Sequence, residues 1–113
     1  MEHVHHTLVA ERDSARQQVD VLRRDLDRVV AASESSNADD EHDPEGATIA
    51  FERAQLATLL GLAERRLADS EVALARWDAG EYDVCEVCGE KIPVERLMAR
   101  PTTRRCVTCA ALP

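Results

Sequence analysis

Apolar residues recur every three or four positions along two segments of the chain, which is the spacing of one face of an α-helix. The first segment alternates steps of four and three through Leu8, Arg12, Ala15, Val19, Leu22, Leu26 and Val29. The second keeps the same alternation through Ile49, Arg53, Leu56, Leu60, Ala63, Leu67, Ser70, Leu74 and Trp77. This heptad seam is typical of paired helices. Because a helix with such an apolar stripe is only marginally stable in water until a partner covers the stripe, we predict an antiparallel two-helix coiled-coil hairpin.

We place the arms of the hairpin at about residues 7–33 and 45–79, and the hairpin domain at residues 1–80. At 1.5 Å per residue the second arm would be about 50 Å long. Gly80 then supplies the left-handed residue that commonly ends a helix. Trp77, at the last seam position, is predicted to pack against the module that follows.

The stretch that joins the arms, residues 34–46, is strongly acidic and contains no lysine or arginine. Asp43 and Pro44 are typical of a helix start, with Asp43 as N-cap, and Glu45 in the first turn would favour the helix dipole. Gly46 is a poor helix former, which leaves a start nearer Thr48 as the alternative. The remaining acids have no evident structural role. Either the stretch is only a polar connection, or its carboxylates act on a partner. The candidate effector residues are Asp39, Asp40, Asp43 and Glu45.

Composition narrows the possible partners. The chain has 113 residues, with one Trp, one Tyr and one Phe, so Leu, Val and Ala must fill a mainly α-helical core. Its net charge is −8, and residues 1–80 hold 17 acids against 9 bases. That excess argues against general nucleic-acid affinity, and we expect no direct sequence-specific DNA binding. No segment reads as a signal peptide or a membrane span, so we expect a cytoplasmic protein that does not bind membranes.

Four cysteines carry the strongest chemical signal, as Cys85-x2-Cys88, seventeen residues, and Cys106-x2-Cys109. This spacing is typical of a zinc site, and in a reducing compartment it favours metal ligands over disulfides. Four thiolates fill a tetrahedral shell and leave no position for an activated water, so we predict one structural Zn²⁺ and no enzymatic activity. A module of residues 81–113 is too small to fold readily without such a metal. His3, His5 and His6 could also bind a metal, but three histidines at the start of a chain are more typical of a disordered end.

The segment WDAGEYDVCEVCGEKIPVERLMARPTTRRCVTC, residues 77–109, resembles the DksA/TraR family of bacterial transcription factors. Shared features are a helix that ends in Gly, an aromatic residue before C-x2-C-G, and the pattern I-x3-R-L-x-A-x-P-T before the second C-x2-C. The resemblance implies a regulator, expected to be monomeric, that binds RNA polymerase directly. Its acidic coiled-coil tip would enter the secondary channel and modulate transcription initiation.

The resemblance also implies roles for two arginines of the module as partner-binding residues, Arg96 and Arg100. Arg100 matches the family arginine of the R-P-T element that contacts the alarmone ppGpp, although Ala110 stands where the family often has a basic residue. The family tip pattern D-x-x-D-x-A is not reproduced in residues 34–46. The alternative function is a zinc-ribbon adaptor that binds RNA or the ribosome through the arginines of the module, Arg96, Arg100, Arg104 and Arg105.

Overall fold

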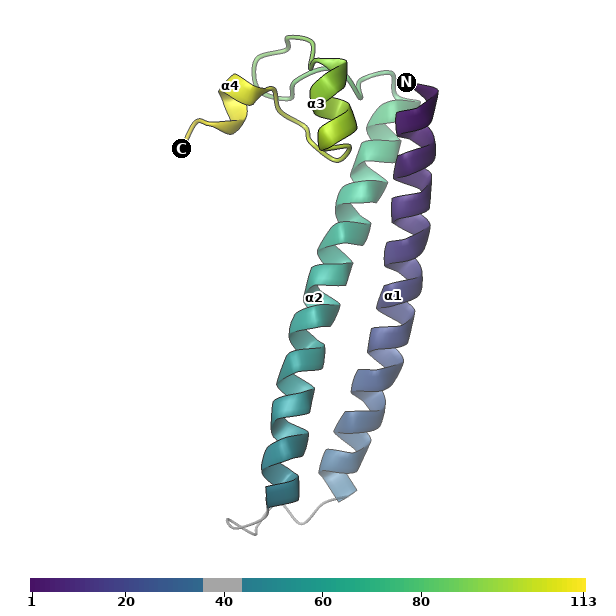
Figure 1. The fold of residues 1–113 in the computed structure, drawn as a ribbon, viewed down its shortest axis with the longest axis vertical. Coiled ribbons are helices and arrows are strands. Elements are labelled where there is room, and N and C mark those ends of the chain that lie inside the picture. Colours follow the sequence, from purple (N-terminus) through teal and green to yellow (C-terminus); the bar gives the residue numbers. More distant parts are fainter. Residues whose placement is uncertain (36–43) are drawn as a thin grey trace. The chain divides into compact units, whose positions relative to one another are not determined.

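The structure is a computed structural model that describes residues 1–35 and 44–113, with side chains described for residues 1–34 and 46–113. Two long helices, α1 (Glu2–Ser35) and α2 (Pro44–Asp78), precede two short ones, α3 (Val94–Ala99) and α4 (Val107–Ala110) (Figure 1). Within the described ranges the only β pairing is an isolated antiparallel bridge between Val84 and Lys91. The predicted mainly α fold with a helical hairpin is confirmed. Among the described residues, no helix combines the length and apolar character that a membrane crossing needs.

The chain forms two compact units, and the first consists of residues 15–65. Here α1 and α2 bury the predicted seam, with Ala15 and Val19 from α1 and Ala63 from α2 each 5% exposed or less. Arg23 and Glu64 pair across the two helices at 3.4 Å. The burial therefore follows the heptad spacing that the sequence predicts.

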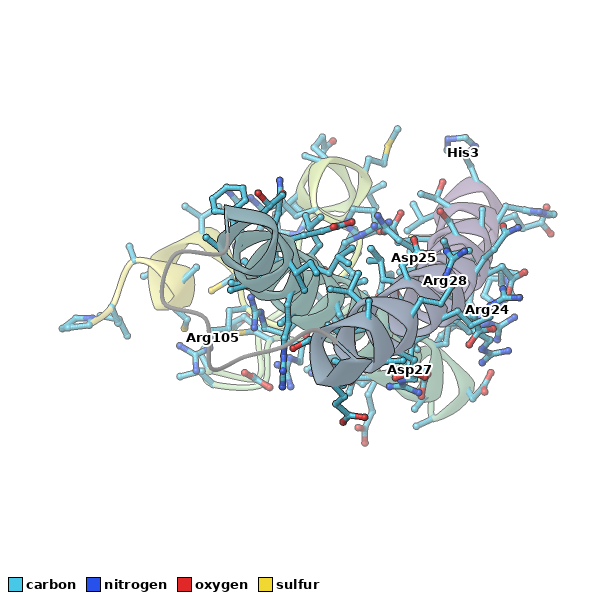
Figure 2. The ribbon with its side chains drawn as sticks, turned by 90° about the horizontal axis from the view of Figure 1, so that it is seen from below. His3, Arg24, Asp25, Asp27, Arg28 and Arg105 are labelled. Atoms are coloured by element: carbon cyan, nitrogen blue, oxygen red, sulfur yellow. The ribbon has the colours of Figure 1, made fainter. Side chains whose placement is uncertain are left out.

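The outer side of α1 in this unit carries charges of both signs (Figure 2). Arg24, Asp27 and Arg28 are exposed, and Arg28 pairs with Asp25 one helical turn away. Exposed pairs of this kind contribute little to stability, typically about 0.3–0.5 kcal/mol. This face is a solvated surface.

The second unit consists of residues 1–14 and 66–113 and has its own apolar core. The two long helices and the cysteine module all contribute to this core, whose buried members are Val4, Leu8, Ala73, Leu74, Tyr82, Cys85, Ile92, Leu97 and Cys109. An ion pair between Glu11 and Arg66, at 2.7 Å, joins α1 to α2 here. The core includes residues from both sides of the boundary that we placed at residue 80, and that boundary stays a prediction.

Helix α1 begins at Glu2, five residues before the predicted start at about residue 7. The expectation of a disordered end at His3, His5 and His6 is wrong, because Val4 extends the seam by one step of four and is 3% exposed. His5 lies against Trp77, with ring centroids 4.7 Å apart. Packing of these first turns holds a segment that would fray as an isolated helix end.

Helix α2 begins at Pro44, one residue before the start predicted at about residue 45 and not near Thr48, because a proline is well suited to the first position of a helix. The predicted N-cap, Asp43, lies outside the described residues. The helix ends at Asp78, and Gly80 follows with φ of 74°, the left-handed conformation expected of it. Trp77 is half-buried against the core of this unit and lies 5.2 Å from Tyr82 between ring centroids, as the sequence predicts for the last seam position.

Candidate metal centre

The four predicted cysteines converge. Their sulfur atoms all lie within 4.8 Å of one another, and Cys88 Sγ is 3.8 Å from Cys106 Sγ. A tetrahedral ion with bonds of about 2.3 Å separates its sulfur ligands by about 3.8 Å. The arrangement therefore fits one Zn²⁺.

The first pair of cysteines sits on a tight turn. The Gly89 amide donates to the Cys85 carbonyl at 3.0 Å, and the Cys85 amide donates to the Glu90 carbonyl at 2.8 Å. Gly89 has φ of 76°, a conformation that side chains oppose and glycine adopts without strain. The turn is supported by the Val84–Lys91 bridge, so the chain returns directly after the second cysteine. This explains why a glycine follows the first pair.

The second pair lies at the start of α4. Cys106 occupies the N-cap position in an extended conformation, and Cys109 lies within the helix. The Ala110 amide donates to the Cys106 carbonyl at 2.9 Å and closes this turn. Cys109 is 5% exposed, whereas Cys88 is exposed, so the site has one side in the core and one toward solvent.

The electrostatics of the thiols favour a cation. Hydrogen bonds from backbone amides, chiefly that of Cys88, lower the pKa of Cys85 to about 6. The neighbouring Cys106 thiol and burial instead raise the pKa of Cys109 to about 12. The backbone thus stabilises one thiolate, while neighbouring sulfurs oppose the ionisation of another. A divalent ion removes that opposition, because it binds thiolates in place of their protons.

The arginines predicted to bind a partner have different surroundings. Arg96 donates from Nε to the Arg105 carbonyl at 2.8 Å and from a terminal nitrogen to Thr103 Oγ1 at 3.3 Å, so its side chain holds the loop before the second pair. Arg105 pairs with Glu86 at 3.2 Å. Arg100 and Arg104 are exposed, and within the described ranges neither forms an ion pair. They are the cations of the module that remain available to a partner.

The predicted tip residues lie largely outside the part of the chain that the structure describes. Asp39, Asp40 and Asp43 lie outside the described residues, and Glu45 is described only as part of the backbone of α2. Their role as effectors stays a prediction.

Two residues near the metal centre were not predicted as functional. Tyr82 is 3% exposed and donates from its hydroxyl to the Pro101 carbonyl at 2.7 Å, and burial raises its pKa to about 12. Arg76, in the last turn of α2, donates to two carbonyls just before the first cysteine pair. The sequence offered only a weak signal for Arg76, since a basic residue near a helix end also has a favourable interaction with the helix dipole.

Comparison with known proteins places this centre in a known class. Residues 80–112 match the family model of the prokaryotic dksA/traR C4-type zinc finger. The chain is similar to the RNA polymerase-binding transcription factor DksA of Haemophilus influenzae, at 40% identity over 50 residues, 43% of this chain and 34% of that one. It is also similar to general stress protein 16O of Bacillus subtilis, at 35% identity over 78 residues, 69% of this chain and 48% of that one. The chain thus spans about a third to a half of the length of these relatives.

A solved structure shares the fold. Transcription factor DksA2 from Pseudomonas aeruginosa matches 91% of this chain and 79% of its own, with a TM-score of 0.57 at 23% identity. The family model and the convergence of the four sulfurs together identify one structural Zn²⁺ site.

Proposed function

Because the chain belongs to the DksA/TraR family of C4-type zinc-finger proteins, we propose that it regulates transcription by binding RNA polymerase directly. The observation that carries this proposal is the C4-type zinc finger, which follows a helical hairpin in the same chain. The ligands of the zinc are Cys85, Cys88, Cys106 and Cys109. The protein acts in the bacterial cytoplasm as a monomer, without chemistry of its own.

The proposal assigns the regulatory action to the acidic stretch between the helices. Residues 34–46 hold six carboxylates and no cation, which suits contact with a metal ion or a basic element of the polymerase. Inserted through the secondary channel, these carboxylates approach the catalytic centre and shift the stability of the initiation complex, which is an allosteric effect. Asp39, Asp40, Asp43 and Glu45 are the effector residues.

The zinc finger supplies the second contact in this proposal. Arg100 and Arg104 are exposed and without an ion pair in the described part of the chain, so each offers a guanidinium to an acidic surface or a phosphate. Arg100 is the candidate contact for ppGpp. The Arg96 side chain bonds within the finger, so its contribution to partner binding includes holding the loop that carries Arg105.

A transcription assay with a neutralised tip tests the proposal. The variant Asp40→Asn/Asp43→Asn/Glu45→Gln should still bind core RNA polymerase but lose its effect on initiation. A matched control, Glu52→Gln/Asp69→Asn/Glu71→Gln, removes the same charge from exposed positions of α2 and should keep the effect. Equal activity of both variants would show that the tip is only a connection, and absence of binding by the wild-type chain at low salt would refute the proposal.

The exposed arginines also favour a second candidate, a zinc-ribbon adaptor on RNA or the ribosome. This function predicts RNA affinity that falls steeply with salt and weakens in Arg100→Gln/Arg104→Gln. RNA binding that is absent, or indifferent to salt, removes this candidate. The net charge of −8 opposes it.

A further inference from the structure

Arg76 links α2 to the chain on both sides of Cys85. Its side chain is 16% exposed, so the guanidinium is largely buried. It donates to the Glu81 carbonyl at 3.0 Å and to the Val84 carbonyl, and it lies 3.8 Å from Glu86 Oε2. Val84 and Glu86 are the two neighbours of Cys85 in the chain. One side chain therefore fixes the backbone before this cysteine and the side chain after it.

Glu86 continues this linkage to the second cysteine pair. Its other carboxylate oxygen pairs with Arg105 Nε at 3.2 Å, and its amide donates to the Arg104 carbonyl at 2.9 Å. Arg105 directly precedes Cys106 in the chain. A continuous polar network, Arg76–Glu86–Arg105, thus joins α2 to both halves of the metal centre.

We propose that Arg76 is a positioning residue of the zinc site, which holds the first cysteine pair in register with the second and thereby slows metal release. A tetrahedral shell needs all four sulfurs at once, so freedom at one cysteine pair lowers the barrier to opening the shell. Outer residues that orient metal ligands typically change metal affinity by about 10- to 100-fold when removed. This inference depends on the zinc site and not on binding to RNA polymerase.

Arginine is suited to this position by its shape as well as its charge. The planar guanidinium presents five N–H donors in a fixed arrangement, which lets it reach two carbonyls and a carboxylate together. Lysine has the charge but only a single ammonium group. Replacement by lysine should therefore restore part of the function and not all of it.

The rate of zinc release from the zinc-loaded full chain tests the proposal. Release into an excess of a chromogenic chelator is measured for Arg76→Met, Arg76→Lys and Glu86→Gln, with circular dichroism as a check on helix content. We expect Arg76→Met to release zinc about 10- to 100-fold faster, Arg76→Lys to fall between it and wild type, and helix content to stay unchanged. The matched control is Arg66→Met on the same helix, whose ion pair with Glu11 is exposed, and it should release zinc within about twofold of wild type.

Two further readouts separate positioning from general stability. In the double variant Arg76→Met/Glu86→Gln the accelerations should not multiply in full, because the two residues share one contact although each also has others. In the cobalt-substituted protein, Arg76→Met should shift the absorption bands of the thiolate-bound cobalt, whereas Arg66→Met should not.

A wild-type release rate in Arg76→Met, an equal acceleration in Arg66→Met, or accelerations that multiply in full in the double variant would each overturn the proposal. If Arg76→Met does not fold, Arg76→Lys decides the test. Release from that variant at the wild-type rate then refutes the need for the guanidinium.

Discussion

Truncation of Leu8 to alanine should destabilise the unit formed by residues 1–14 and 66–113 far more than any surface change on the same helix. Leu8 is 0% exposed and lies in the core that also contains Cys85, Leu97 and Cys109. A fully buried Leu→Ala change costs about 2.7–5 kcal/mol, because the lost contacts add to the cavity that remains. Among the described residues this core has nine buried members, so few neighbours can move to fill the space, and we expect about 3 kcal/mol or more.

Urea denaturation at fixed free zinc, followed by circular dichroism, measures this loss. Free zinc must be held constant, because an ion that binds only the folded state adds to the free energy of unfolding. Val21→Ala is the matched control on α1, since Val21 is 44% exposed, and it should change the free energy of unfolding by about 0.5 kcal/mol or less. A cost for Leu8→Ala that equals that of Val21→Ala would refute the shared core.

Four further changes give distinct readouts. Gly89→Ala should destabilise the zinc-loaded protein by about 1–2 kcal/mol in the same denaturation assay, because the residue has φ of 76°. Gly61→Ala should instead stabilise it by about 0.5–1 kcal/mol, because Gly61 lies in a helix and an added Cβ would meet only the flexible tip of Arg65, at 3.7 Å. Wild type should lose stability as pH rises from about 10 to 12, because the phenol of Tyr82 has a pKa near 10 in the unfolded chain and about 12 in the folded one, and Tyr82→Phe should abolish this loss. The free energy of unfolding against pH, together with the absorbance of the single tyrosinate, measures this. Zinc chelation should change the fluorescence of Trp77, the only tryptophan, because its neighbour Tyr82 belongs to the core of the metal module; an unchanged spectrum would contradict that coupling.

The hairpin seam could be predicted because its cause is local. A side chain that recurs every three or four residues shares one helical face whatever the rest of the chain does. The seam position Ser70 illustrates this, since it is 0% exposed although polar, and its hydroxyl is satisfied by the Arg66 carbonyl at 2.9 Å. Arg53, at another seam position, is exposed. The heptad spacing therefore predicts which face of the helix a residue lies on, and not how deeply its side chain is buried.

The metal ligands could be predicted for a similar reason, since two residues between thiols bring both sulfurs to one ion. What holds the two pairs together could not, because those contacts join distant positions. Glu86 meets Arg105 across nineteen residues, and Tyr82 meets the Pro101 carbonyl across the same separation. The start of α1 was missed because it depends on Val4 packing into a core whose other buried members, apart from Leu8, lie about seventy or more residues away.

The last turns of α2 show why the zinc site and the base of the hairpin form one structure. Ala73 and Leu74 belong to the core that also contains Cys85 and Cys109. Arg76 donates to the Val84 carbonyl, and the ring of Trp77 contacts those of His5 and Tyr82. These residues of α2 thus contact the metal centre through the shared core, the chain before Cys85 and Tyr82. Metal binding therefore contributes to the stability of the paired helix ends, and not only to that of the loops that hold the ion.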